Sequence, residues 1–292
     1  MKRFTLSVLS LVLLTDVCSA QQATAVMTRV GDTFRGHIQQ VRTENVSIRF
    51  KNGEIVEGPR ILTNVVSYSE DGRRRELKAY ARGSLQKRTV ETFLPGGQLE
   101  SISVDNGDGI FVSRVGFEYD AAGRLTIETR YLADGSIKEK KVNQWNESSG
   151  LVAVTKSTGD GTTLQTSINS NNYSLMKNGE PKRSVWTTFK ADGSRTENIF
   201  EVDSTGTHND QQINYGADGS LSGKRVSIVD AGITRLEATE YDASGGIKKR
   251  TLQTQEYDSH HNLNKITHFV WNAERNEFQP FGITYHTIVY YK

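Results

Sequence analysis

The stretch Tyr119-Asp120-Ala121-Ala122-Gly123-Arg124-Leu125 decides the fold, because it sets an aromatic residue, a five-residue turn and an aliphatic residue in that order. Close copies of it begin at four further aromatic residues: Tyr131, Tyr215, Tyr241 and Tyr257. Looser copies begin at Tyr68, Phe93, Trp145, Phe189 and Val202. Glycine, or Asn262 in the last close copy, accepts the positive φ that ends a tight turn, and Asp accepts hydrogen bonds from nearby backbone amides. The repeat therefore predicts a series of tight turns.

The spacing of these turns predicts that the segments between them are β-strands. Leu125 and Tyr131 are six residues apart, and Ile137 and Trp145 are eight apart. Residues an even number of positions apart lie on one face of a strand, so we expect both ends of each strand to contact one apolar layer. Several glycines recur every 13 residues: Gly193, Gly206, Gly219, Gly232 and Gly245. The period fits a strand of about 8 residues and a turn of about 5.

These observations define the predicted fold class. It is all-β: an antiparallel meander of repeated β-hairpins, with a period of about 13 residues per strand and turn. We expect the sheet to be open or partly rolled. Hydrophobic residues make up only 35% of the 292 residues, and Leu252 is the single apolar residue between Ile247 and Tyr257. Such a strand is not buried on both faces, so much of the sheet is expected to contact water.

The first 20 residues have the three parts of a secretory signal peptide. Lys2-Arg3 supply the positive charge, residues 6–14 form a short apolar run, and Cys18-Ser19-Ala20 precede the expected cleavage site. The run is too short to span a bilayer. Cys18 is the only cysteine, so the chain after residue 20 contains no disulfide. We therefore predict a bacterial protein that is secreted or periplasmic.

The rest of the chain divides into two parts. Residues 21–65 form an expected N-terminal β capping segment, which contains a hairpin signal at Lys51-Asn52-Gly53-Glu54. Residues 66–292 form the repeat array, and the apolar stretch 281–291 is expected to be its last strand and a second cap. No stretch of useful length has a helical period after the signal.

The residues that open the array resemble a known repeat. Tyr119-Asp120-Ala121-Ala122-Gly123-Arg124-Leu125-Thr126 is similar to the YD repeat of the Rhs family, and Tyr241-Asp242 and Tyr257-Asp258 carry the same dipeptide. The resemblance covers the chain from about residue 66 onward. It implies long β-sheets that wind into a shell around a toxin domain or form a display surface. This chain is short and has no toxin-like C-terminal domain. Its turns are also similar to the β-hairpin repeats of MORN-like bacterial proteins.

A search for catalytic and metal-binding motifs favours no enzyme class. The chain lacks the G-x-S-x-G, H-E-x-x-H and P-loop motifs. His260, His261 and His268 offer imidazoles for zinc, and the run from Asp105 to Gly109 offers oxygens for calcium, but neither has the ligand spacing of a known site. The Asp-Gly pairs follow the turn period, so geometry explains them. We predict no enzyme, no cofactor and no metal.

Two functions remain from the sequence, and both are binding functions. The first is an exported repeat protein whose sheet surface binds an envelope or surface protein or acts as an envelope scaffold. The second is a carbohydrate-binding or adhesive module of the cell surface, in which strand-end aromatic residues stack on sugar rings. The candidate binding residues are Trp145, Tyr215, Tyr241, Tyr257 and Trp271.

Two kinds of partner are excluded at this level. The net charge of +2 arises from interspersed acidic and basic residues, so no nucleic-acid partner is expected. A barrel that spans a membrane needs an apolar outer band. Strand centres such as Lys224-Arg225 and Lys248-Lys249-Arg250 do not supply one, so the chain is predicted not to span a membrane.

Overall fold

The computed structural model describes residues 37–51, 54–146, 150–169 and 183–291, and these contain strands and turns without a helix. The strands are β1 (Ile38–Lys51), β2 (Glu54–Glu57), β3 (Ile61–Tyr68), β4 (Arg74–Ala81), β5 (Ser84–Phe93), β6 (Leu99–Asn106), β7 (Phe111–Tyr119), β8 (Leu125–Leu132), β9 (Ile137–Asn146), β10 (Gly150–Thr158), β11 (Thr163–Asn169), β12 (Arg183–Lys190), β13 (Arg195–Val202), β14 (His208–Tyr215), β15 (Leu221–Val229), β16 (Arg235–Tyr241), β17 (Ile247–Tyr257), β18 (Leu263–Asn272) and β19 (Glu277–Tyr290). From β3 onward each strand pairs antiparallel with the next. The predicted all-β antiparallel meander is confirmed.

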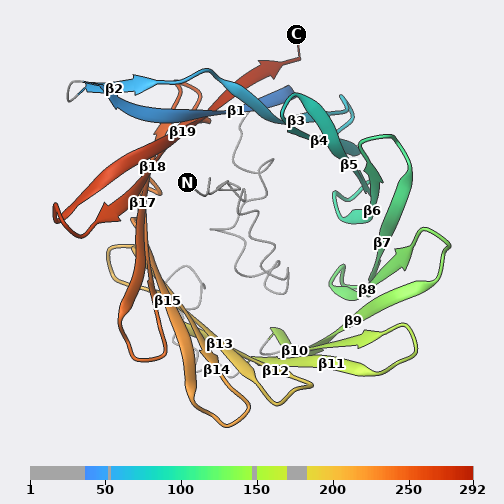
Figure 1. The fold of residues 1–292 in the computed structure, drawn as a ribbon. Helices are drawn as coiled ribbons and strands as arrows, with labels where there is room; N and C mark the ends of the chain where they lie inside the picture. The colour runs from blue at the N-terminus through green and yellow to red at the C-terminus, as the bar shows by residue number, and fades with distance from the viewer. Residues whose placement is uncertain (1–36, 52–53, 147–149, 170–182, 292) are drawn as a thin grey trace.

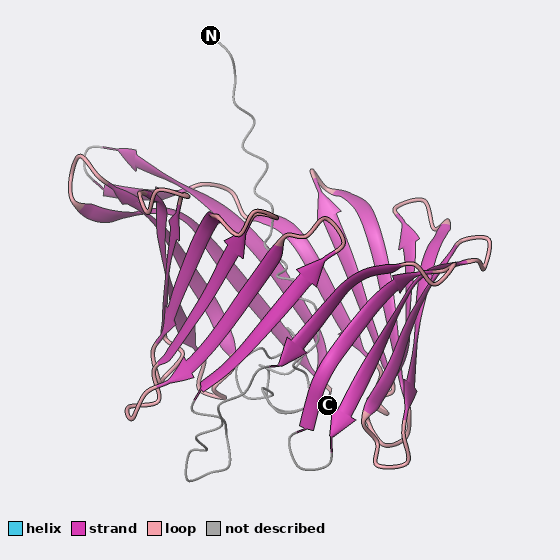
Figure 2. Cartoon of the chain, turned by 90° about the horizontal axis from the view of Figure 1, so that it is seen from below, coloured by secondary structure: helices cyan, strands magenta, loops and turns pink. Residues whose placement is uncertain are grey.

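The sheet closes into a barrel, so the expectation of an open or partly rolled sheet is wrong (Figures 1 and 2). β1 pairs along one edge with β19, from Ile38 opposite Tyr290 to Ser47 opposite Gly282, and along its other edge with β3. All of the 19 strands except β2 form the wall, which therefore has 18 strands. Closure removes the unpaired edges that an open sheet would leave.

The first and last strands form the seam of this wall. Residues 38–65, which the sequence analysis assigned to a capping segment, supply β1, β2 and part of β3. β2 pairs with the end of β1, with Lys51 opposite Glu54 as the hairpin signal predicted. β19 also has partners on both edges, so the predicted final strand exists but does not cap the array. A buried apolar cluster lies at the seam and contains Ile38, Val41, Val66 and Leu263.

The predicted turns that lie within the described residues are present, with two changes in detail; the turn expected after Trp145 falls mainly on residues 147–149, outside the described residues. Asp120 Oδ1 accepts hydrogen bonds from the amides of Ala122 and Arg124, and Gly123 has a φ of 76°. In the last close copy the positive φ falls on His261, at 59°, and not on Asn262. Near residue 230 it falls on Ile233 and not on the periodic Gly232. Asn262 is instead fully buried, and its Nδ2 donates to the Tyr290 hydroxyl at 2.6 Å.

A β-bulge beside most turns changes which face the strand ends occupy. The pairing of β7 with β8 shifts between Glu118 and Tyr119, and the pairing of β8 with β9 shifts between Arg130 and Tyr131. Each shift inserts one extra residue, which reverses the alternation of side chains. Tyr119 and Tyr131 therefore lie on opposite faces; the Tyr131 ring lies 3.7 Å from where a Cβ of Gly116 would be. The expectation of a single apolar layer is wrong for this reason.

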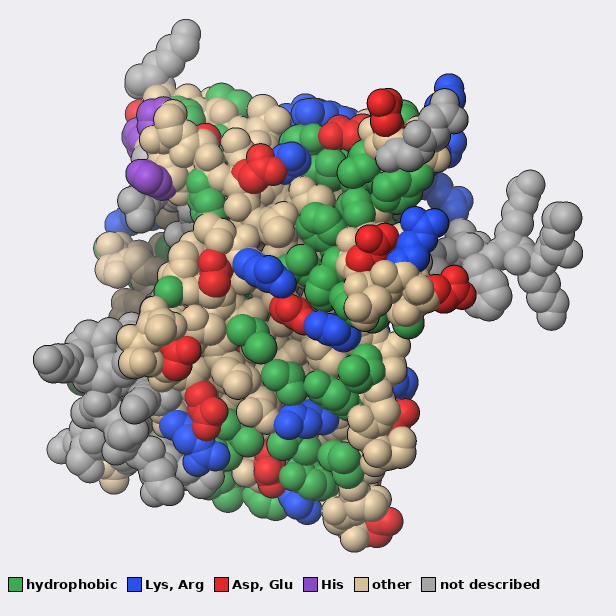
Figure 3. Space-filling model, turned by 90° about the vertical axis from the view of Figure 1, so that its left-hand side faces the viewer, with side chains coloured by type: hydrophobic (Ala, Val, Ile, Leu, Met, Phe, Trp, Pro, Cys, Tyr) green, Lys and Arg blue, Asp and Glu red, His purple; other side chains and the backbone are tan. Residues whose placement is uncertain are grey.

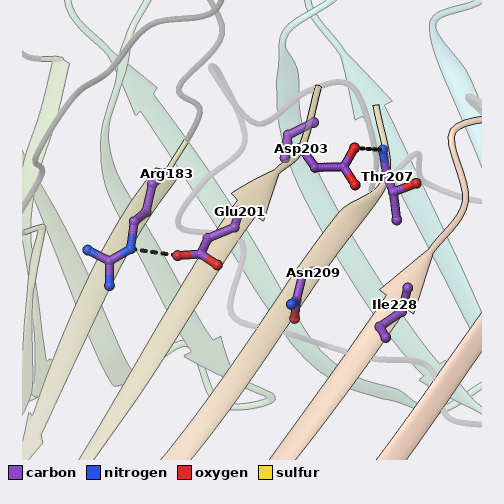
Figure 4. Close-up of a pocket in the computed structure, with 7 residues that line it drawn as sticks. Arg183, Glu201, Asp203, Thr207, Asn209 and Ile228 are labelled. Carbon is purple, nitrogen blue, oxygen red and sulfur yellow. Dashed lines mark hydrogen bonds and ion pairs between the residues drawn. The ribbon is translucent and has the colours of Figure 1, made fainter. Parts of the chain in front are cut away.

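The register separates an outer face from a luminal face. Figure 4 shows Arg183, Glu201, Asn209 and Ile228, which lie opposite one another on β12 to β15, on the near side of these strands with the far wall behind them. Their face is the outer one. Side chains crowd together on the concave luminal face, where those of Lys141 and Arg75 are only 12% and 16% exposed.

Candidate luminal binding face

A row of polar side chains crosses six neighbouring strands on the luminal face. Trp186 on β12 lies opposite Asn198 on β13, which lies opposite Gln212 on β14. The pairing continues through β15, β16 and β17 with Arg225, Glu240 and Lys249. We call Trp186, Asn198, Gln212, Arg225, Glu240 and Lys249 the luminal row. It combines one indole ring, two amides, a guanidinium, a carboxylate and an amine.

The luminal row keeps most of its hydrogen-bonding capacity. Its one internal bond is long, with Gln212 Nε2 at 3.4 Å from Asn198 Oδ1. Within the described residues, Arg225 Nε is buried without a hydrogen-bond partner. Arg225, Glu240 and Lys249 also make no ion pair with any side chain in that part of the chain, although the register places them side by side. A ligand in the lumen would therefore find donors, acceptors and charges that the protein has not used.

The rows of luminal side chains on either side of the luminal row are also mainly polar. On one side Asp210 lies between Phe200 and Ser227, and burial raises the pKa of its carboxyl group. On the other side Thr196 Oγ1 donates to Asn214 Oδ1 at 2.9 Å. The luminal faces of β12 to β17 are therefore largely polar, and we call this surface the open wall.

The luminal face of β4 to β10, which we call the paired wall, is organised differently. Arg75 Nη2 on β4 lies 2.8 Å and 2.6 Å from the two carboxylate oxygens of Glu91 on β5. Further along, Lys141 pairs with Glu128 at 3.6 Å, and Lys156 Nζ lies 3.0 Å from Glu139. The charges of these pairs are neutralised within the protein, so they offer less to a ligand.

The seam adds a third luminal sector with two histidines. Thr43 Oγ1 lies 3.1 Å from His286 Nδ1, and His268 Nε2 lies 2.9 Å from Thr284 Oγ1, which in turn donates to Asn45 Oδ1 at 3.0 Å. Burial lowers the pKa of His286 to about 4 and lowers that of His268. Both rings are therefore held neutral at ordinary pH, and they join β1, β18 and β19 through hydrogen bonds.

The structure does not bring the predicted binding aromatics together. Trp145 and Tyr257 lie on the luminal side at the lower rim, where β19 ends in Figure 2. Tyr215, Tyr241 and Trp271 lie on the outer face at the upper rim. The reversal of faces by the bulges separates the two groups, so these five residues do not form one row.

Several of these aromatics already have partners. Trp145 Nε1 donates to the Leu125 carbonyl at 2.7 Å, and the Tyr257 hydroxyl donates to the Ile233 carbonyl at 3.2 Å. The Arg195 guanidinium lies 3.9 Å from the centre of the Tyr215 ring. The Arg250 guanidinium lies 4.4 Å from that of Trp271. These cation–π contacts tie neighbouring strands together on the outer face.

A recess of about 490 Å³ lies on the outer face near the lower rim, where β12 to β15 adjoin (Figure 4). Arg183 Nε lies 2.7 Å from Glu201 Oε1, and Asp203 Oδ1 accepts a hydrogen bond from the Thr207 amide at 3.0 Å. The charged groups of the recess therefore bind one another. The luminal row has more unused hydrogen-bonding groups for a ligand than the recess has.

The side chains that the sequence analysis named as possible metal ligands do not lie together in the described part of the chain. His268 bonds to Thr284 on the luminal face, while His260 lies in the β17–β18 turn with its ring 5.6 Å from that of Tyr290. The described residues contain no group of three His, Cys, Asp or Glu side chains placed to hold a metal ion. In the run at residue 105, Asp105 accepts from Arg88 at 2.9 Å. No helix among the described residues is long and apolar enough to cross a membrane. The predicted signal peptide lies outside the described residues.

The sequence analysis missed the luminal row because its members come from six strands. Trp186 and Lys249 are 63 positions apart in the chain (249 minus 186) and share no motif. The sequence signal that could have found the row is the alternation of inward and outward side chains within each strand. This alternation must be counted from the bulge and not from the turn. This count places Asn198, Gln212 and Arg225 on one face, and it needs the register of every pair.

Comparisons with known proteins add a limited likeness. No family model and no curated protein matches the chain. Among solved structures, a porin-like protein from Bacteroides uniformis matches with 10% identity over 86% of this chain and 98% of that chain, at a TM-score of 0.39. The TcdB2-TccC3-TEV structure matches with 10% identity over 73% of this chain and 16% of that one, at 0.23. Intact Ap-TbpB matches with 7% identity over 87% and 80%, at 0.18.

Proposed function

We propose that this protein is a non-enzymatic, exported β-barrel that binds carbohydrate on the open wall of its lumen. The luminal row carries the proposal, because it places an indole ring beside two amides and several unpaired charged groups. A sugar ring presents an apolar face and a rim of hydroxyl groups. An indole packs against the face, and planar amide, guanidinium and carboxylate groups exchange hydrogen bonds with the rim.

The outer face supports a barrel that contacts water and does not span a membrane. Arg88 on β5 lies 3.1 Å from Glu76 on β4 and 2.9 Å from Asp105 on β6, near the middle of the wall. On the side shown in Figure 3, apolar side chains are interrupted by charged ones. A lipid-facing barrel requires a continuous apolar band, and charges at this depth are costly there. We propose a barrel with water on both faces, and the proposed export rests on the signal-peptide pattern of residues 1–20.

A pair of neighbouring glutamines provides the test of this function. Gln212 points into the lumen and Gln211, the next residue, points outward. We expect Gln212→Ala to weaken the binding of oligosaccharides by about fivefold, since a hydrogen bond to a ligand contributes about 1 kcal/mol. Gln211→Ala should leave it unchanged. Isothermal titration of the full chain with a panel of oligosaccharides measures both. Equal losses in the two variants, or no binding by the native protein, would contradict luminal binding.

Binding of an envelope protein is a second candidate, favoured by the hairpin of β1 and β2. Phe50 and Ile55 lie opposite each other there and are 56% and 54% exposed. The hairpin extends beyond the barrel wall (Figure 1). Replacing both residues with Ser should then abolish the stoichiometric retention of a protein from envelope extract, whereas Gln212→Ala should not. Retention that survives the double substitution would exclude this surface.

A further inference from the structure

We infer that the ligand of the luminal row is a linear, acidic oligosaccharide that lies across the strands and pairs its carboxylate with Arg225. This inference rests on the proposed carbohydrate-binding function and specifies the ligand of the same site. Two observations carry it: the length of the row and the state of its charges.

The length of the row favours a chain of linked sugars over a single sugar. Trp186 and Lys249 lie on β12 and β17, at the two ends of the row. Neighbouring strands lie about 4.8 Å apart, so five intervals separate the two residues by about 24 Å along the wall. The groups between them repeat at the strand spacing. A ligand that contacts the whole row must therefore be extended and must run perpendicular to the strands.

The charges of the row favour an acidic ligand. Arg225 and Lys249 carry two positive charges, and Glu240 between them carries one negative charge, which leaves an excess of one positive charge on the row. Asp210, in the adjacent row, is the closest further acid by register; it lies diagonal to Arg225, and no ion pair joins the two in the described residues. On the paired wall, by contrast, Arg75 holds both oxygens of Glu91.

Arg225 is the residue of the row best suited to hold a carboxylate. Its guanidinium is planar and can present two parallel N–H groups to the two oxygens of a carboxylate. Burial of its Nε, without a partner among the described residues, leaves a donor whose hydration is already lost. A ligand carboxylate would bind the terminal N–H groups of the same guanidinium, which no ion pair in the described residues occupies. Lys249, one strand beyond Glu240, would attract the next acidic sugar as a point charge.

The test compares ligands that differ only in charge. The full chain is titrated with oligogalacturonates of two to six units, with oligomers of guluronate, and with the methyl esters of both, which keep the backbone and lose the charge. We expect the acids to bind about tenfold more tightly than their esters. We also expect affinity to rise with length, and the preference for acids to fall as salt is added.

Two variants assign the preference to Arg225. In Arg225→Gln the acids should lose their advantage of about tenfold, so that the acids and their esters bind equally. In Glu240→Gln, which removes the opposing charge, the preference for acids should increase. Thermal melting of each variant shows whether the barrel remains folded.

Each outcome is decisive. Esters that bind as tightly as acids, a preference that persists in Arg225→Gln, or binding of neutral oligosaccharides alone would overturn the acidic ligand and leave carbohydrate binding in place. If neither the acids nor any neutral oligosaccharide binds the native protein, the proposed function itself fails. Affinity that does not rise beyond two units would exclude the extended orientation.

Discussion

The paired wall and the open wall of the lumen are built from the same repeat and differ in how they use charge. In the paired wall the register sets Arg75 opposite Glu91 and Glu128 opposite Lys141, so the ions neutralise each other. In the open wall it sets Arg225 opposite Gln212 on one side and Glu240 on the other, with no ion pair formed. The difference teaches that a uniform backbone can carry a structural sector and a binding sector, assigned by side chains alone.

The largest expected effect comes from breaking the paired wall. Glu91→Ala leaves the Arg75 guanidinium in the lumen wall without its carboxylate, and each side chain of the native pair is only 16% exposed. Losing one partner of such a pair should lower the free energy of unfolding by about 2 to 3 kcal/mol. Chemical denaturation measures the change.

The matched change in the open wall is Glu240→Ala, which removes a carboxylate that has no ion-pair partner among the described residues. It should change the free energy of unfolding by less than about 0.5 kcal/mol. Equal losses at the two positions would show that the two walls do not differ in the way their charges indicate.

The seam between the two walls should give the barrel its dependence on pH. The pKa of His286 is lowered to about 4 in the fold, from about 6.5 in an unfolded chain. Above pH 6.5 the His286 imidazole is neutral in the folded and the unfolded state, so its full contribution to the free energy of unfolding is present. As pH falls from 6.5 towards 4, the imidazole binds a proton in the unfolded chain but stays mostly neutral in the folded one. The free energy of unfolding therefore decreases by about 2 to 3 kcal/mol.

Denaturation curves collected between pH 4 and 7 measure this loss, and His286→Gln is the control. The variant keeps a hydrogen-bonding side chain next to Thr43 but cannot be protonated in this range. Its stability should therefore change less with pH than that of the native protein. An identical pH profile in the two proteins would assign the effect to other groups, His268 among them.

A smaller effect is expected on the outer face, which serves as a reference for both walls. Arg250→Ala removes an ion pair with Glu237, at 2.7 Å, and the cation–π contact with Trp271. Partly exposed contacts of this kind contribute about 1 kcal/mol together. Thermal or chemical unfolding measures the loss, and oligosaccharide affinity should not change. A change in affinity would indicate that the outer face also takes part in binding.

A small gain in stability is expected from a substitution that converts the open wall into a paired one. Gln212→Glu places a carboxylate directly opposite Arg225. Cross-strand pairs of opposite charge contribute about 0.2 to 1 kcal/mol, so the barrel should become slightly more stable. Its affinity for acidic oligosaccharides should fall by about tenfold, because Arg225 is then occupied. Gln211→Glu on the outer face is the control, and an unchanged affinity in Gln212→Glu would contradict the role of Arg225.

Local features of the fold were predictable from the sequence, and its closure was not. The turn at Asp120 and Gly123 follows from the conformational freedom of glycine and the hydrogen bonds of one side chain. Closure depends on the pairing of Ile38 with Tyr290, which are 252 positions apart (290 minus 38). No local pattern encodes such a contact, and both terminal strands have the apolar character that also fits a cap.

The candidate site was out of reach for a related reason. An even separation of Leu125 and Tyr131 indicates a shared face only when the strand is regular, and the bulges at both ends break that condition. The same irregularity moved Trp145 and Trp271 to different faces, and the opposite directions of β9 and β18 place them at different rims. The spacing of turns predicts how many strands exist, whereas the function depends on which side chains the strands turn inward.

The bulged hairpin has a consequence for how this protein can change in size. Each hairpin returns the chain to the rim from which it started, with its faces in the same orientation, so one hairpin can be inserted or removed without turning any other strand inside out. A single strand cannot, because it would reverse the direction of everything that follows. Duplication or loss of a gene segment encoding one hairpin would therefore widen or narrow the lumen in steps of two strands, and a protein engineer could use the same steps to match the barrel to a chosen cargo.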